Sequence, residues 1–176
     1  MLSLVVFLTG CFFVATVHAG CNTGPIDAKK SIVGPGSGKY YLLKSTYKDE
    51  KSCLYVEALP QGTAFPAQYP FGYKEGGNWV KNQGTVDGQG ADILDNDEKF
   101  GKTTTKLVYS DYKVCDVGLF SGEKVGGPHV ELWKHSAADG NSDAFRCCKL
   151  RYEEELQARG KQSEVREIGS GCNYPN

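Results

Sequence analysis

The fold is decided by two stretches, KVCDVGLF at residues 113–120 and PHVELWKH at residues 128–135. Both are rich in Val, Leu and aromatic residues and lie between turn-forming segments, which is typical of β-strands. Successive side chains of a strand point to opposite faces of its sheet. Cys115 and Asp116 therefore face opposite ways, and Glu131 shares a face with Trp133 but not with Leu132.

Strand-like segments continue on the N-terminal side of these stretches, and one helix is predicted near each end of the chain. The strands are predicted near 39–47, 52–59, 64–73, 77–81, 90–95, 102–111, 113–120 and 128–135, separated by turns rich in Gly, Asn and Asp. A short helix is predicted over 26–32, and a longer one over 143–157 that ends at Gly160. Many short strands followed by one helix indicate a mainly β fold, either an up-and-down barrel or a sandwich. A barrel of about eight strands can hold one small ligand.

Residues 1–19 have the features of a secretory signal peptide. They contain apolar runs, no acidic residue and no Lys or Arg, and they end in Val17-His18-Ala19. The alternative, a membrane anchor, is disfavoured because Thr9-Gly10 breaks a run that is already short for a bilayer. We expect a secreted, extracellular protein with a single domain at 20–176, acting as a monomer. The formal net charge of −1 gives no reason to expect a nucleic-acid or membrane partner.

Six cysteines remain once the predicted signal peptide is removed: Cys21, Cys53, Cys115, Cys147, Cys148 and Cys172. An even number in a secreted chain indicates three disulfides, and six cysteines allow 15 pairings. Adjacent cysteines rarely bond each other because the ring would be strained, which leaves twelve of these pairings open. A zinc site is the alternative, but the predicted mature chain has no CxxC pair and only His129 and His135 as further ligands.

The facing of the strands predicts which side chains enter the barrel. If Cys115 bonds to a cysteine of the C-terminal helix outside the barrel, Asp116 faces the lumen. On the last strand, Val130 and Leu132 suit packing under that helix, which turns Glu131 and Trp133 inward. If Lys44 and Lys106 face solvent, the alternating residues of their strands face the lumen. These are Tyr41, Leu43, Ser45 and Tyr47 on the first strand, and Leu107 and Tyr109 on 102–111.

The lumen is thus predicted to collect two carboxylates among aromatic side chains, namely Asp116, Glu131, Trp133, Tyr47 and Tyr109. Burying carboxylates is unfavourable unless they are paired. The natural partner is a ligand cation, held by ion pairing and by cation–π contacts worth roughly 0.5–2 kcal/mol each. The alternative is that the carboxylates are solvated at the barrel mouth or bonded to Lys, Arg or Tyr.

A spaced motif in this region resembles the signature of tick salivary lipocalins that bind biogenic amines. It consists of Cys115-Asp116-Val117, Glu131-Leu132-Trp133 and Cys147, separated by two gaps of 13 residues. Further similar segments are KSTYK at 44–48, YSD at 109–111, Asp27-Ala28 and Lys30-Ser31-Ile32, and the paired Cys147-Cys148 with the Glu-rich helix resembles soft-tick members. The resemblance covers nearly the whole mature chain. It implies an eight-stranded antiparallel lipocalin barrel with a short N-terminal helix and a C-terminal helix packed outside.

The resemblance also implies what the lumen does. Such a protein sequesters host histamine or serotonin, with Asp116, Glu131, Trp133 and, less firmly, Tyr47 lining the pocket. The implied disulfides are Cys21–Cys147, Cys53–Cys172 and Cys115–Cys148.

The sequence departs from two-site histamine binders at positions where they carry acidic or aromatic residues. It has Pro35 before the first strand and Thr103 and Thr105 before Tyr109, and the register of the acid in Asp49-Glu50 is ambiguous. One working site is therefore expected. Asp27 could touch the ligand from the N-terminal helix, but an exposed acid at the helix start is the alternative role that we favour.

Two other functions remain open at this stage. Related lipocalins capture leukotrienes or other fatty-acid mediators, or bind complement protein, although a lipid carboxylate would require Arg or Lys in the lumen. An enzyme is disfavoured because the chain has no G-x-S-x-G elbow. Asp116 and Glu131 could in principle form a glycosidase pair, but many proteins have two carboxylates. No cofactor and no metal is expected.

Overall fold

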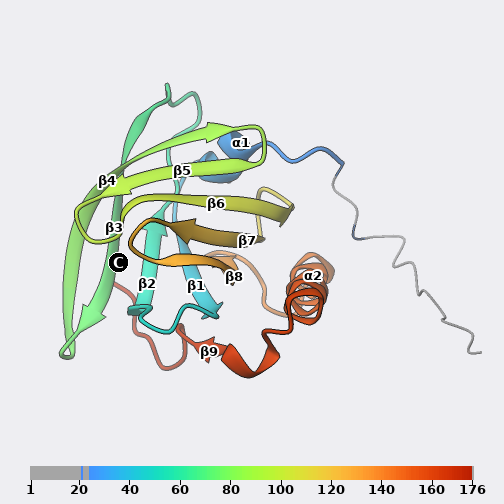
Figure 1. Cartoon of the computed structure of the whole chain (residues 1–176). Coiled ribbons are helices and arrows are strands. Elements are labelled where there is room, and N and C mark those ends of the chain that lie inside the picture. Colours follow the sequence, from blue (N-terminus) through green and yellow to red (C-terminus); the bar gives the residue numbers. More distant parts are fainter. Residues whose placement is uncertain (1–20, 22–23, 176) are drawn as a thin grey trace, which may run out of the picture.

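The computed structural model describes Cys21 and residues 24–175, so the predicted signal peptide at 1–19 lies outside the described residues. The strands wrap into a barrel, helix α2 (Asp143–Arg159) packs on its outside and the short helix α1 (Ala28–Val33) lies at one end (Figure 1). The barrel strands are β1 (Lys39–Ser45), β2 (Ser52–Glu57), β3 (Ala67–Glu75), β4 (Asn78–Gln89), β5 (Asp92–Asp97), β6 (Gly101–Ser110), β7 (Cys115–Gly122) and β8 (Gly126–His135). A 3-10 helix η1 (Gln162–Glu164) and a two-residue strand β9 (Arg166–Glu167) follow α2. Within the described part of the chain, no helix is long and apolar enough to cross a membrane.

The sheet closes on itself. Each strand from β1 to β8 pairs antiparallel with the next, and β1 also pairs with β8 through Leu42 opposite Trp133 and Ser45 opposite Glu131. Closure leaves none of these eight strands as a free edge. The short strand β9 pairs in addition with β1. The mainly β, eight-stranded antiparallel barrel predicted from the sequence is confirmed, and the sandwich alternative is not.

Strand β4 is much longer than the segment 77–81 that the sequence pattern indicated. Its second half contains Gly84 and Gly88, which weaken the strand signal because glycine has no side chain to pack. The structure explains both residues. A Cβ atom at Gly84 would meet the ring of Tyr69 at 2.7 Å, and one at Gly88 would meet the backbone of α1 at 2.7 Å.

Helix α1 closes one end of the barrel. Its Ala28 amide donates to Gly90 in the β4–β5 turn, and its Ile32 carbonyl accepts from Leu59, which follows β2. The helix begins after Asp27, whose side chain accepts from the amides of Lys29 and Lys30. The β1–β2, β3–β4, β5–β6 and β7–β8 connections lie at the other end, which has no such helix in the described chain.

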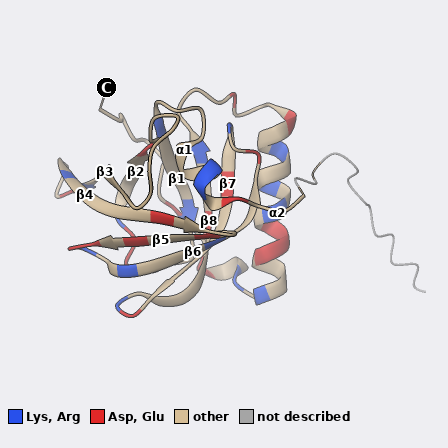
Figure 2. Cartoon of the chain, turned by 90° about the horizontal axis from the view of Figure 1, so that it is seen from above, with Lys and Arg blue, Asp and Glu red and all other residues tan. Residues whose placement is uncertain are grey.

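Helix α2 packs against the outer face of β6, β7 and β8. Its predicted stripe of Phe145, Cys148, Tyr152 and Leu156 is buried there against Val117, Leu119, Val130 and Leu132. The Ser142 side chain caps its first turn by accepting from the Phe145 amide, and Gly160 ends it in a left-handed conformation with φ 63°. Acidic and basic positions both occur along the helix, as expected for one that lies on the surface (Figure 2).

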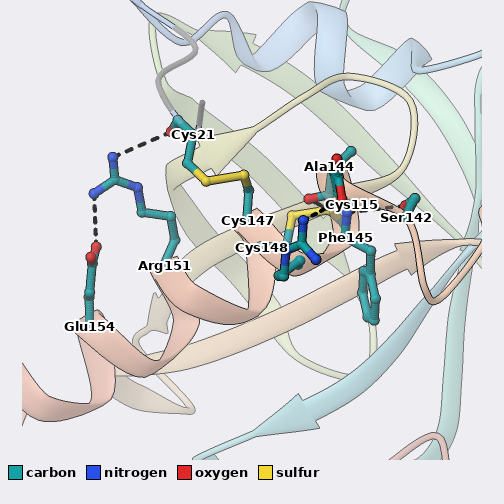
Figure 3. The surroundings of a disulfide bond; sticks show 11 residues. Cys21, Cys115, Ser142, Ala144, Phe145, Cys147, Cys148, Arg151 and Glu154 are labelled. Carbon is teal, nitrogen blue, oxygen red and sulfur yellow. Dashed lines mark hydrogen bonds and ion pairs between the residues drawn. A yellow bond between two sulfur atoms is a disulfide. The ribbon is translucent and has the colours of Figure 1, made fainter. Parts of the chain in front are cut away.

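The three disulfides expected from the resemblance are all present. Cys21–Cys147 and Cys115–Cys148 join the N-terminal segment and β7 to consecutive residues of α2 (Figure 3). Cys53–Cys172 ties the C-terminal segment to β2. Arg151 of α2 donates to the Cys21 carbonyl and pairs with Glu154, which fastens the start of the described chain to the helix. Because Cys115 is bonded outward, Asp116 points into the barrel.

Candidate ligand-binding site

A cavity of about 130 Å³ lies inside the barrel. Its walls combine aromatic and aliphatic side chains with six acidic residues: Glu50, Glu57, Asp95, Asp97, Asp116 and Glu131. Among the described residues that line it there is no Lys, Arg or His. Such a cavity offers negative charge and ring faces, and its walls offer no cationic partner for a bound anion.

Asp116 of β7 is buried near α1. It is 7% exposed, and its Oδ1 atom has no hydrogen-bond partner among the described residues. Burial raises the pKa of Asp116 to about 7, although hydrogen bonds from the hydroxyls of Ser110 and Ser31 act to lower it. Tyr40 of β1 also lines the cavity, and its buried hydroxyl likewise lacks a partner in the described structure. This end of the cavity thus holds a carboxyl group with an unused acceptor atom.

Glu131 and Trp133 face the cavity from β8, as the alternation of the strand predicts. The Trp133 Nε1 atom donates to Glu131 Oε2 at 2.9 Å, which fixes the indole beside the carboxyl group. Glu131 is 2% exposed. Burial, and next the negative charge of Glu50, raise the pKa of Glu131 well above its ordinary value, while the Trp133 hydrogen bond acts against this shift.

Glu50, in the β1–β2 loop, completes this acidic pair and was not predicted as a site residue. It is 6% exposed; its Oε1 accepts from the Lys51 amide at 3.1 Å, and its Oε2 has no partner among the described residues. Burial raises the pKa of Glu50 to about 7, against hydrogen bonds from the Lys51 amide, Glu131 and Ser45 and the charge of Arg166. Each of the two carboxyl groups lies close enough to shift the pKa of the other, and the charge of Glu50 favours the protonated state of Glu131. The sequence had left the register of the acid in Asp49-Glu50 ambiguous, and the structure places Glu50 in the cavity wall.

Asp95 of β5 is a further acidic group that sequence reasoning missed. It lines the cavity, and burial raises its pKa to about 7 even though part of the residue remains accessible to solvent. The Tyr69 hydroxyl donates to it and lowers that pKa, whereas the nearby charge of Asp97 raises it. Figure 2 shows the acidic positions of this part of the barrel along the ribbon of β5.

Three predicted site residues do not line the cavity. Tyr47 lies beside it, because its ring centre is 6.0 Å from that of Phe120, which is a lining residue. Tyr109 belongs to the outer core under α2, so its predicted place in the lumen is wrong. A β-bulge between Leu107 and Tyr109 reverses the facing of β6 beyond that point. Asp27 caps α1, which is the alternative role that the sequence favoured.

The facing predicted for the first strand was also partly wrong, for the same reason. A bulge between Leu42 and Lys44 places Tyr40 and Leu42 inside, whereas Leu43 packs toward α2. Tyr41 stacks on Tyr174 with ring centres 3.7 Å apart, and it is not among the residues that line the cavity. Ser45 faces inward as predicted, next to Glu131 and Glu50.

A closed eight-stranded barrel with an external C-terminal helix and an acidic and aromatic cavity inside it defines a lipocalin, a class of small-molecule binding proteins. The chain belongs to the tick histamine-binding protein family, whose model matches residues 22–172. The protein is also 26% identical over 144 residues to Moubatin of Ornithodoros moubata, a match that covers 80% of each chain.

Solved structures agree with this assignment. The serotonin complex of AM182 is 30% identical in sequence, with a TM-score of 0.66 over 82% of this chain and 90% of AM182. The bovine lipocalin allergen Bos d 2 has a TM-score of 0.59 over 84% of this chain and 99% of its own, at 11% identity. That second similarity concerns the fold alone. The predicted relationship to amine-binding tick lipocalins is therefore confirmed.

Proposed function

We propose that this protein is a secreted scavenger that sequesters a small biogenic amine, histamine or serotonin, in its barrel lumen. Removal of these mediators would counter host inflammation and haemostasis. In this proposal residues 1–19 are a cleaved signal peptide, residues 20–176 are the mature monomeric domain, and the protein is a binder and not an enzyme. No cofactor or metal takes part.

The observation that carries the proposal is the charge of the cavity wall. Asp116, Glu131 and Glu50 are all buried, and none of the described residues that line the cavity is basic. An ionised carboxylate in such surroundings is destabilised until a cation pairs with it. A protonated amine supplies that cation, and the aromatic residues, Trp133 first among them, supply faces for its ring and for cation–π contact.

The size of the cavity supports a small ligand over a lipid. A cavity of about 130 Å³ is close to the roughly 150 Å³ at which an apolar cavity holds a single benzene ring. Leukotrienes are far larger, and their carboxylate would meet acidic residues. AM182, a 30% identical relative, was solved with serotonin, and the family is described as histamine-binding.

The test is calorimetric titration of the mature protein with histamine, serotonin and a cysteinyl leukotriene. Histamine has eight heavy atoms, which sets a ceiling of roughly 12 kcal/mol on its binding free energy. We expect a sub-micromolar dissociation constant for at least one amine and little binding of the leukotriene. Tight leukotriene binding without amine binding would refute the proposal and favour a lipid scavenger.

A further inference from the structure

Two separate acidic centres face the same cavity, and each has a buried oxygen atom without a hydrogen-bond donor. The Asp116 centre consists of Asp116 with Ser31 and Ser110, and its free acceptor is Asp116 Oδ1. The Glu131 centre consists of Glu131 with Glu50 and Trp133, and its free acceptor is Glu50 Oε2. Both free acceptors belong to residues that line the cavity.

The strand register sets the separation of Asp116 and Glu131 along the barrel wall. Asp116 lies directly opposite Trp133, and Glu131 lies two residues from Trp133 on the same face of β8. Such diagonal neighbours on adjacent antiparallel strands are about 7–8 Å apart. Trp133 lies between the centres, since it is paired with Asp116 across the strands and hydrogen-bonded to Glu131.

One ammonium group can occupy only one of these centres. A monoamine bound at the Asp116 centre supplies no cation to the Glu131 centre. Arg166 of β9 acts on Glu50, but it does not line the cavity. A buried carboxylate left without its charge partner is destabilised, so a second ammonium group on the same ligand gains an interaction at the second centre.

We propose that the lumen also binds linear aliphatic diamines, with one ammonium group at each acidic centre and the methylene chain along the Trp133 indole. The inference rests on the proposed use of the lumen as an amine site and extends it to a ligand class without an aromatic ring. The spacing of two centres, and not the ring pocket, sets the specificity for this class.

Diamines and monoamines should differ in the number of protons that the protein releases when they bind. Burial raises the pKa values of Asp116, Glu50 and Glu131, which favours their protonated states in the absence of a ligand cation. A diamine ionises both centres, whereas a monoamine ionises one. The other acidic groups that act on these carboxyl groups are Asp111 on Asp116 and Asp95 on Glu131, and they favour the protonated state.

The experiment compares putrescine, a four-carbon diamine, with n-butylamine, which has the same chain and one charge. Each is titrated calorimetrically at pH 7 in two buffers of different ionisation enthalpy. We expect putrescine to bind at least tenfold more tightly and to release more protons per ligand. Equal affinities for the two amines would overturn the inference.

A variant tests whether the Asp116 centre holds one of the two ammonium groups. Asp116→Asn should abolish the preference for putrescine over n-butylamine, because the variant keeps only the Glu131 centre to hold an ammonium group. Glu123→Gln, an exposed acid in the β7–β8 turn, serves as the matched control and should change neither affinity. An Asp116→Asn variant that keeps the full preference for putrescine would also overturn the inference.

The outcome separates the two proposals. If histamine or serotonin binds tightly and putrescine binds no better than n-butylamine, the bridging inference fails and the proposed function stands. If putrescine binds tightly and neither aromatic amine does, the lumen is a diamine site and the proposed function fails. The wild-type comparison requires no variant to fold.

Discussion

The buried carboxyl groups of the lumen have neutral partners and no cationic ones within the described cavity wall. Asp116 accepts hydrogen bonds from serine hydroxyl groups, Glu131 accepts one from the Trp133 indole, and Asp95 accepts one from the Tyr69 hydroxyl. Neutral donors stabilise an ionised carboxylate only in part, and for this reason burial still raises these pKa values. Under the proposed function, a ligand cation supplies the charged partner that these carboxyl groups lack in the described cavity wall.

Removing the charge at single residues tests this arrangement. Asp116→Asn and Glu131→Gln keep the shape of the side chain and delete the charge. At least one of them should weaken amine binding by about tenfold or more, since each 1.4 kcal/mol corresponds to a factor of ten. Trp133→Phe should cost less, because an aromatic face survives. The double substitution should be non-additive if both acids contact one ligand.

The measurement is the dissociation constant of histamine and serotonin for each variant at one pH and salt concentration, with Glu123→Gln as the exposed control. If the carboxylates are instead solvated, both charge removals leave the affinity within about twofold. That result would remove Asp116 and Glu131 from the site.

A pair of tyrosines on opposite sides of the barrel wall offers a matched comparison. The Tyr40 hydroxyl is buried, lacks a hydrogen-bond partner in the described structure and belongs to a residue that lines the cavity. Tyr109 lies in the outer core. Tyr40→Phe should weaken amine binding by about two- to tenfold, the range of one net hydrogen bond. Tyr109→Phe should leave it unchanged. Titration of both variants with amine measures these affinities. A larger loss of affinity for Tyr109→Phe than for Tyr40→Phe would contradict the facing of β6.

At the scale of secondary-structure elements, most of the barrel could be predicted from the sequence, but the facing of two strands could not. Alternation is reliable only while a strand is regular. The bulges at Leu42–Lys44 and Leu107–Tyr109 each add a residue and exchange the inner and outer faces beyond it. Neither bulge has a sequence signature such as Gly, so Tyr41, Leu43 and Tyr109 were placed on the wrong side.

The same limit applies to the site. Asp116, Glu131 and Trp133 could be placed because β7 and β8 are regular from Cys115 to Phe120 and because the Cys115–Cys148 bond fixes one face. Glu50 lies in a loop, where no periodicity determines facing. Asp95 lies in β5, whose sequence DILDND has acidic residues at positions of both faces. Long-range packing, and not local pattern, brings these two acids into the cavity.

Helix α1 gives a prediction that separates a structural role of Asp27 from a ligand role. Its carboxylate accepts from the amides of Lys29 and Lys30, so Asp27→Ala should reduce the free energy of unfolding by about 1 kcal/mol. Amine affinity should stay within twofold, because Asp27 is not among the lining residues. Denaturant unfolding and titration of the same variant check both parts. A large loss of affinity with unchanged stability would return Asp27 to the site.

At the scale of the whole molecule, barrel closure and three disulfides hold several carboxyl groups in a cavity that they would not occupy without constraint. The covalent links join α2 to β7 and to the N-terminal segment, and the C-terminal segment to β2. Such constraints stabilise mainly by limiting the unfolded chain. The fold can therefore tolerate unfavourable burial of acids, and this tolerance should be visible as an unusual dependence of stability on pH.

The direction of this pH dependence follows from the raised pKa of Asp116. Its pKa is about 7 in the folded protein and 3.8 in the unfolded chain, so between these values the folded state holds a proton that the unfolded state has released. Stability from this group is fully present below pH 3.8, falls as the pH rises toward 7 and is lost above it. Asp116→Asn cannot ionise and escapes this loss. The advantage of the variant should therefore grow by up to about 3 kcal/mol between pH 5 and pH 8.

Denaturant unfolding of the oxidised protein at both pH values measures that difference, and contributions from Glu50, Glu131 and Asp95 cancel between wild type and variant. A saturating amine should stabilise the wild type more at pH 8 than at pH 5, since the cation pairs with the ionised form. It should stabilise Asp116→Asn less at pH 8, because one partner is missing. Parallel pH profiles for the two proteins, with and without amine, would mean that Asp116 is already solvated or paired in the empty barrel.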